Sequence, residues 1–259
     1  MSAGRPALRW APRPWALRVV SVAAILLAWQ VAGERSPILM STPRAVAVAF
    51  GDMVADGTLG HALASSLVVL AIGLGTGTAA GVAIGLAAGR SNTVAWLIDL
   101  PVNALYAVPA VTLIPVIVLW FGFGTLTKTA VVFLFVVFPV LISTMRGIRE
   151  VDPDLVEVAR SFQSSERRMW ADLFLPSALP YVVTGLRLAI GRALIGVIVA
   201  EYYTALSGLG YLISTNANDF NTARMFVPIV VIAALGVALT ALLGVAERRL
   251  APWRKAAEQ

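Results

Sequence analysis

The chain has 259 residues, of which 59% are hydrophobic and only 13% are charged. Soluble domains carry about 25% charged residues, so this composition excludes an ordinary water-exposed surface and indicates the lipid bilayer as the solvent. The net charge of +6 comes without a basic face of interleaved aromatic residues, which excludes a typical nucleic-acid interface. The chain contains no cysteine and one histidine, His61, so the sequence predicts neither disulfides nor a metal site.

Six segments are apolar enough to cross a membrane, for which a helix needs about 20 residues. They lie at residues 16–33, 64–89, within 94–121, 127–145, 182–204 and 225–246. The first is longer than the apolar region of about 7–15 residues in a secretory signal peptide, so we expect a retained helix. We therefore predict an all-α membrane protein with a single six-helix transmembrane domain over 16–246, between tails at 1–15 and 247–259.

The distribution of Lys and Arg predicts the orientation of these segments. Fourteen of the twenty lie before or at the start of the first segment, after the second, between the fourth and fifth, or after the sixth, and four lie in or at the edge of the other connections. Positively charged connections stay in the cytoplasm. Both tails and the connection at about 146–180 are therefore expected to be cytoplasmic.

The second segment contains a glycine at every fourth position. These residues are Gly73, Gly77, Gly81, Gly85 and Gly89. They share one helix face, and small residues at this spacing let two helices approach closely in lipid. The run lacks the Lys-Ser/Thr ending of a phosphate-binding loop, so we expect helix packing here and no ATP hydrolysis through that motif.

The third segment is too long and too rich in proline for one straight helix. Its 28 residues would span about 42 Å, and it contains Pro101, Pro109 and Pro115. We predict an interfacial or bent part up to about Asn103 and a kinked spanning part after it. Proline kinks suit a pathway or a moving joint, but each is equally compatible with a bent bundle helix.

The fifth segment contains three charged residues, Arg187, Arg192 and Glu201. Arg192 lies near mid-depth, where a charge is costly and faces the bundle interior or a cavity. It could line a route for an anion, or it could be a structural pin. Together with Pro109 and Trp120, these three residues are the candidate residues of a translocation path.

A polar stretch, EVARSFQSSERRMWADLFLP, occupies residues 157–176. Asp152 and Pro153 predict the start of a short helix that runs to about Phe162. Leu155, Ala159 and Phe162 are expected on one face, with Val158 beside it. The next residues predict a turn and a second short helix that ends at Pro176, before Pro180 opens the fifth span. From physics alone, this hairpin could lie on lipid headgroups or dock a cytoplasmic partner.

The stretch resembles the EAA loop of permease subunits of binding-protein-dependent ABC importers. Glu157-Val158-Ala159 matches E-A-A, Phe174-Leu175-Pro176 matches the closing I-x-LP region, and Gln163 stands where the family has glycine. Residues 105–124 and 185–211 are similar to the subgroup that imports nitrate, sulfonates and taurine. Related permeases of this subgroup also carry cyanate, aromatic acids and vitamin precursors.

The resemblance implies a type I ABC importer permease in the bacterial inner membrane, with no cofactor and no enzymatic activity of its own. Its partners would be a second permease copy in a homodimer, two cytoplasmic ATPase subunits that bind ATP and Mg, and an extracytoplasmic solute-binding protein. The solute would be small and anionic. The residues that would couple to the ATPase are Glu157, Ala159, Arg160, Phe162, Gln163, Leu175 and Pro176.

Two other classes of function remain as alternatives. A stand-alone secondary transporter or channel would need coupling-ion sites and often contains internal repeats, yet few acidic residues lie in the spans. A membrane hydrolase would need a nucleophile, a base and an oxyanion stabiliser close together. No motif in the sequence indicates that constellation.

Overall fold

The computed structural model describes residues 14–36, 39–204 and 206–250, whose regular elements are all helical. They are α1 (Pro14–Arg35), α2 (Pro43–Ala55), α3 (Thr58–Arg90), α4 (Asn92–Ala107), η1 (Ala110–Leu113), α5 (Ile114–Phe121), α6 (Thr125–Arg149), α7 (Pro153–Ser161), α8 (Glu166–Met169), the π-turn η2 (Trp170–Phe174), α9 (Leu175–Thr204), α10 (Leu209–Asn218) and α11 (Thr222–Leu250). Within this part of the chain, five helices are long and apolar enough to cross a membrane, and a bent pair completes a sixth span. The expected tails lie largely outside the described residues.

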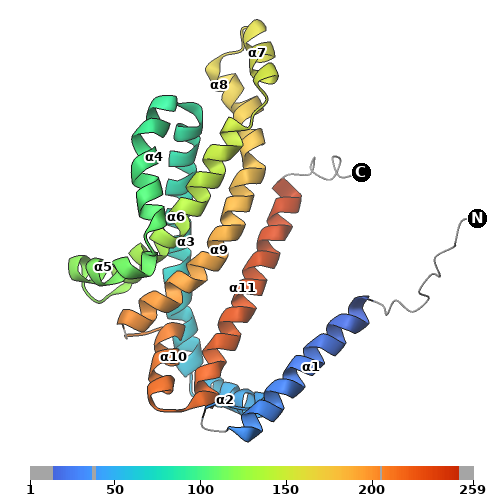
Figure 1. Cartoon of the computed structure of the whole chain (residues 1–259), viewed down its shortest axis with the longest axis vertical. Helices are drawn as coiled ribbons and strands as arrows, with labels where there is room; N and C mark the ends of the chain where they lie inside the picture. The colour runs from blue at the N-terminus through green and yellow to red at the C-terminus, as the bar shows by residue number, and fades with distance from the viewer. Residues whose placement is uncertain (1–13, 37–38, 205, 251–259) are drawn as a thin grey trace, which may run out of the picture.

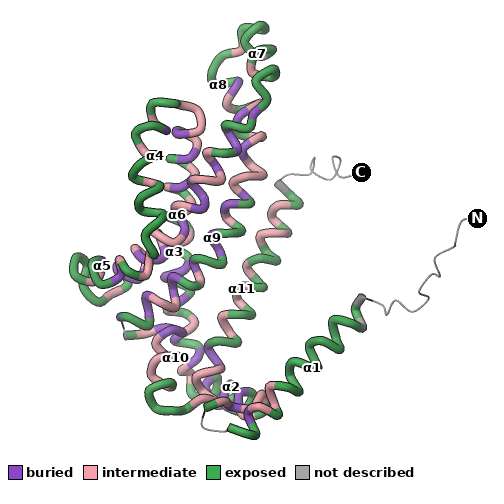
Figure 2. Tube along the Cα trace, viewed as in Figure 1, coloured by how far each residue is buried: buried purple, intermediate pink, exposed green. Residues whose placement is uncertain are grey.

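Helices α3, α6 and α9 form the centre of the bundle, with α6 packed against both of the others. Figure 2 shows that buried positions concentrate on these three helices, whereas α1 and much of α11 are exposed. The central apolar cluster consists of Val69, Leu70, Val132, Val136, Val140, Ala189, Ala193 and Val197. Helix α1 leans away from the bundle (Figure 1) and meets it near α2 and at Phe226 of α11. The apolar surfaces of α1 and α11 are thus left for lipid or for another protein.

The glycine stripe of α3 lies where this helix crosses α6. A Cβ atom on Gly73, Gly77, Gly81, Gly85 or Gly89 would lie 2.5–2.8 Å from an atom of α6. Real side chains do not approach so closely, so these positions admit only glycine without a shift of the two helices. The closest neighbours on α6 are Val132, Val136, Val137, Leu141, Thr144 and Ile148.

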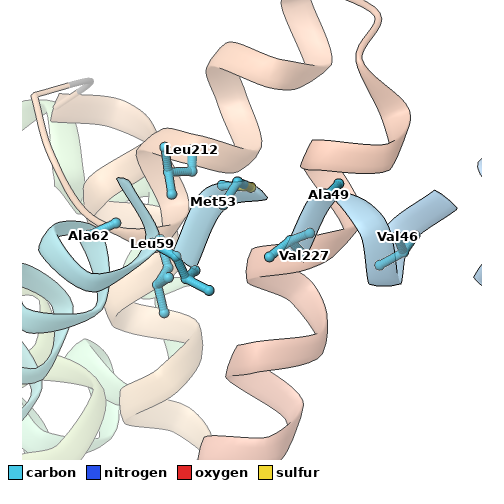
Figure 3. Close-up of a cluster of buried hydrophobic side chains, with 8 residues drawn as sticks. Val46, Ala49, Met53, Leu59, Ala62, Leu212 and Val227 are labelled. Carbon is cyan, nitrogen blue, oxygen red and sulfur yellow. The ribbon is translucent and has the colours of Figure 1, made fainter. Parts of the chain in front are cut away.

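Two short helices that the sequence did not predict, α2 and α10, close the end of the bundle opposite to α7 and α8 (Figure 1). Met53 of α2, Leu59 of α3, Leu212 of α10 and Val227 of α11 meet in one cluster (Figure 3). Thr42 caps α2 by accepting a hydrogen bond from the backbone N–H of Ala45, and Pro43 occupies the first turn. This cluster joins the consecutive helices α2 and α3 to the consecutive helices α10 and α11, which lie far apart in the sequence.

The break in the third segment lies later than expected. Helix α4 continues through Pro101 and Asn103 to Ala107, and the chain then bends by 92° before η1 and α5. Val108 has ψ 128°, the extended conformation that a following proline favours, and Pro109 follows it. The predicted boundary at about Asn103 was therefore wrong, because the decisive residue is the one that precedes Pro109.

The prediction that Pro176 ends a helix and that Pro180 opens the next was also wrong. Residues Glu166–Thr204 form one helical run of 39 residues, and both prolines lie inside it. The π-turn precedes Pro176, and there the N–H of Leu175 bonds to the carbonyl of Trp170. A π-turn interrupts the regular hydrogen-bond ladder. The helical run therefore continues through Pro176, although proline has no backbone N–H to donate.

Candidate coupling helix and membrane cavity

Helix α7 presents a stripe of large apolar side chains to solvent. Leu155, Val158 and Phe162 are 53%, 52% and 81% exposed, and their spacing places them on one helix face. The helix projects beyond the ends of α4 and α11 (Figure 1). Asp152 starts it by accepting a hydrogen bond from the N–H of Asp154 at 2.9 Å. We call Leu155, Val158 and Phe162 the exposed stripe.

The opposite face of α7 packs on the bundle. Val156 and Ala159 lie against a cluster of Ile148, Val151, Met169, Phe174 and Ala178. Ala159 lies four residues after Leu155, on the same side of the helix as expected, but it is less exposed than Leu155 and Phe162. Ala159 lies at the edge between the two faces, and its small side chain is half-covered, so it helps to seat α7.

Gln163 has φ 54°, in the left-handed region that glycine adopts without strain. The N–H of Ser164 donates to the carbonyl of Ala159 at 3.0 Å, and the N–H of Gln163 donates to that of Arg160 at 2.8 Å. These two bonds form a Schellman motif. Ser165 then caps α8 by accepting from the N–H of Arg168. A tight turn is thus kept although the family's glycine is absent.

We expect Gln163→Gly to stabilise this turn by up to about 1 kcal/mol, because glycine carries no steric penalty at this φ. Gln163→Val should destabilise it, since a β-branched residue is strained there. Amide hydrogen exchange of residues 160–166 in the assembled complex measures both effects. Faster exchange in Gln163→Gly than in the wild type would contradict this account.

The ends of α3 and α6 that lie nearest to α7 are tied to the helical run by charged side chains. Nη2 of Arg90, at the end of α3, lies 2.8 Å from Oε1 of Glu166, and its guanidinium stacks over the Phe174 ring at 5.2 Å. Between these residues and the inner side of α7 lies a cavity of about 550 Å³, which Glu157 and Arg160 help to line. Of the predicted coupling residues, these two therefore border a recess rather than the exposed stripe.

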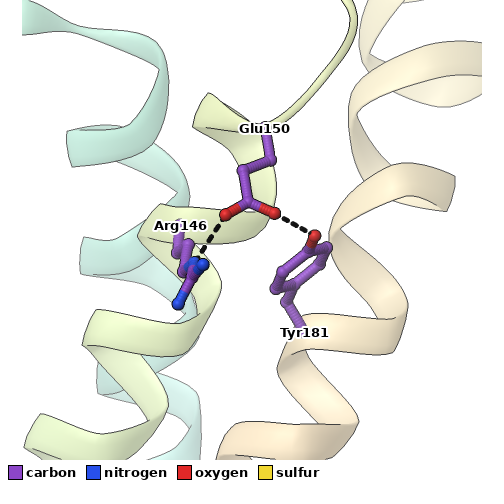
Figure 4. A network of polar contacts seen from close by, with 3 residues as sticks. All are labelled: Arg146, Glu150 and Tyr181. Carbon is purple, nitrogen blue, oxygen red and sulfur yellow. Dashed lines mark hydrogen bonds and ion pairs between the residues drawn. The ribbon is translucent and has the colours of Figure 1, made fainter.

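A second tie joins the end of α6 to α9 (Figure 4). Glu150 accepts a hydrogen bond from Nε of Arg146 at 2.5 Å and another from the hydroxyl of Tyr181. The bond from Tyr181, with that from Arg146, lowers the pKa of Glu150. Leu175 and Pro176 lie just before this tie, at the start of α9, where Leu175 is exposed and Pro176 is half-buried.

A second cavity, of about 290 Å³, lies where the chain breaks between α4 and η1. Nη2 of Arg192 donates to the hydroxyl of Tyr106 at 2.9 Å, and the guanidinium lies 5.2 Å from the centre of that ring. Pro109 also lines this cavity. The structure therefore brings Arg192 and Pro109 together, as residues of one site.

The other candidate path residues lie elsewhere. Trp120 is 71% exposed on α5, and Arg187 pairs with Glu247 of α11 at 2.5 Å. Neither residue lines the cavity at Arg192.

Glu201 is fully buried, and this corrects its assignment to the path. Its carboxylate accepts hydrogen bonds from the Ser66 hydroxyl at 2.8 and 2.9 Å and from the N–H of Gly210 at 2.9 Å. Beside it, buried Lys128 donates to the carbonyl and the hydroxyl of Ser207. Glu201 thus clamps the connection between α9 and α10. Sequence reasoning missed this role because Ser66 is 135 residues away.

A known protein family matches most of the helical bundle in sequence. Residues 77–252 match the family model described as "Binding-protein-dependent transport system inner membrane component". The chain belongs to this family. The permease is 38% identical to the "Putative aliphatic sulfonates transport permease protein SsuC" of Escherichia coli (strain K12), over 97% of this chain and 96% of that protein.

Two further relatives cover similar lengths. The Bacillus subtilis (strain 168) protein of the same name is 33% identical, over 94% of this chain and 90% of its own. The "Taurine transport system permease protein TauC" of Escherichia coli (strain K12) is 30% identical, over 95% and 92% of the two chains. The predicted family and fold are thus confirmed. The chain is a multi-pass inner-membrane permease subunit of an ABC transporter, and the ATPase is a separate subunit.

Proposed function

We propose that this permease forms the import path for a small anionic solute of the sulfonate or taurine type and couples it to the ATPase through α7 and α8. The names of its relatives support the class of solute. ATP and Mg bind to the ATPase, and this chain needs no cofactor.

The observation that carries the coupling proposal is the exposed stripe. Two large apolar side chains of the nine-residue helix α7, and Phe162 at its C-cap, are left uncovered by the chain itself. An amphipathic helix buries such a face in a groove of a partner. The Arg90–Glu166 pair and the Glu150–Tyr181 bond tie this region to the bundle, so that a pull on α7 acts on α3, α6 and α9.

The remaining partners follow from the family and from the charge distribution. Two permease copies, here identical, enclose the path, and two ATPase subunits each hold one α7. The tails lie in the cytoplasm with α7, because the positive charges of the connections gather on that side. An extracytoplasmic solute-binding protein docks at the end formed by α2 and α10.

Charge on the exposed stripe should break this coupling. We expect Phe162→Asp and Val158→Asp each to weaken association with the ATPase about thirtyfold or more, because a carboxylate would enter an apolar groove without a partner. Co-purification of the ATPase and its stimulation by the loaded binding protein measure the effect.

Leu39→Asp is the matched control, because Leu39 is 77% exposed and lies in the connection between α1 and α2. Figure 1 shows α2 at the end of the bundle opposite to α7. It should leave ATPase co-purification unchanged. Normal assembly and stimulation in both stripe variants would refute the coupling proposal.

A further inference from the structure

We propose that the cavity at Arg192 is a transit site for unbranched alkanesulfonates, which binds the sulfonate through Arg192 and the alkyl tail through its apolar walls. This inference rests on the proposed function and adds to it a defined site, a chemical class of solute and an order of preference. Figure 1 places the break between α4 and α5 between the two ends of the bundle that α7 and α10 mark.

The guanidinium of Arg192 is available to an anion. In the described part of the chain, Tyr106 provides its hydrogen bond and its ring contact, and Arg192 takes part in none of the ion pairs found there. A guanidinium has five donors in a planar fork. One bond to Tyr106 leaves donors free for the oxygens of a sulfonate, in the charge-assisted pairing that arginine makes with oxyanions.

The position of Arg192 in the membrane supports the same conclusion. It lies about 25 Å along α9 from Leu175 and about 18 Å from Thr204, at 1.5 Å per residue. Its side chain is exposed on the single chain. A charge at this depth is too costly to face lipid, so this surface of α9 faces water or protein within the path.

The walls of the cavity suit a hydrocarbon tail. They are formed by Leu105, Val108, Leu113, Leu134, Phe135, Phe138 and Ile195, beside Tyr106, Pro109 and Ala110. Arg192 is the only charged residue among the lining residues, so an ammonium group would find no carboxylate there. A volume of about 290 Å³ is at the lower end of the range for ligand sites. The site therefore favours an alkanesulfonate over the zwitterion taurine.

The same contacts would exist if Arg192 and Tyr106 were only a brace between α9 and α4. A brace would not discriminate between solutes by tail length. A substitution of Ala110 can distinguish a transit site from a brace, because Ala110 lines the cavity with a small side chain. Ala110→Leu would occupy the space for the tail and leave the guanidinium in place.

The test uses the complete complex in proteoliposomes, with the binding protein loaded with ³⁵S-labelled methanesulfonate, hexanesulfonate or taurine. We expect Arg192→Gln to lower uptake of both alkanesulfonates at least about tenfold. Such a factor corresponds to the loss of one hydrogen bond to a charged group. Stimulation of ATP hydrolysis by the loaded binding protein should stay within about twofold of the wild type. Wild-type uptake of hexanesulfonate should exceed that of taurine.

Ala110→Leu should lower hexanesulfonate uptake at least about tenfold more than methanesulfonate uptake. Ala83→Leu, at an exposed position of α3, should change neither. Three results would each overturn the transit site: unchanged uptake in Arg192→Gln, joint loss of uptake and ATPase stimulation in that variant, or an equal effect of Ala110→Leu on both tails. If the assembled wild type takes up none of the three solutes with ATP, the proposed solute class fails instead.

Discussion

Replacing Gly208 by alanine should prevent the permease from assembling in a stable form. Gly208 has φ 109°, and a Cβ atom there would overlap the carboxylate of Glu201. The carboxylate has no room to retreat, because Ser66 and Gly210 hold it within a fully buried site. A strained φ and a buried clash act together at this position.

Glu201→Ala should have a related effect without any clash. It would leave the N–H of Gly210 and the Ser66 hydroxyl without their acceptor and would remove an acidic group that attracts Lys128. We expect a loss of about 2–4 kcal/mol. The midpoint of thermal unfolding and the monodisperse fraction in detergent measure both variants.

Gly51→Ala is the control for Gly208→Ala, because a Cβ at Gly51 would have no neighbour within 4 Å. It should be neutral or slightly stabilising, since alanine favours the helix. Equal midpoints for Gly208→Ala and Gly51→Ala would show that the clamp does not hold the connection between α9 and α10.

Gly77→Leu should drive α3 away from α6. A Cβ at Gly77 would lie 2.8 Å from Cβ of Val136 and 3.2 Å from the carbonyl oxygen of Phe133. Backbone cannot move aside as a side chain can, so we expect a loss of about 3 kcal/mol or more. The yield of folded permease and its thermal midpoint report this loss.

Gly75→Leu is the matched control for the stripe, because a Cβ at Gly75, two residues away on the same helix, meets nothing within 4 Å. It should fold normally. The double variant Gly77→Ala/Val136→Gly moves the small residue to the facing helix and should recover part of the loss of Gly77→Ala alone. Without such recovery, the contact between these two residues would not explain the effect.

The spans and the α7 helix could be predicted because their signals are local. A run of apolar residues, or a cap such as Asp152-Pro153, is complete within a few turns of chain. Helix α2 was missed because it is short and carries Arg44 and Asp52, so it does not resemble a span. Helix α10 was missed because its sequence, LGYLISTNAN, ends in polar residues.

The roles of the site residues could not be predicted, because they depend on contacts with distant parts of the chain. Sequence spacing treats Arg192 and Glu201 alike, as charges in one helix. Their surroundings differ because Tyr106 and Pro109 reach Arg192 from α4 and the following break, whereas Ser66 of α3 and Gly210 of α10 reach Glu201. Only the packing of distant segments separates a residue beside a cavity from a residue of the core.

In the proposed coupling, the continuous helical run from Glu166 to Thr204 would act as a lever whose pivot is the π-turn. Its short arm is α8, which Arg90 ties to α3, and its long arm carries Arg192 about 27 Å beyond the π-turn, at 1.5 Å per residue. A tilt of about 10° around that turn would displace Arg192 by about 5 Å, roughly one helical pitch. With the proposed docking of α7 on the ATPase, a small rotation imposed there would be amplified into a movement of Arg192 as large as a small solute.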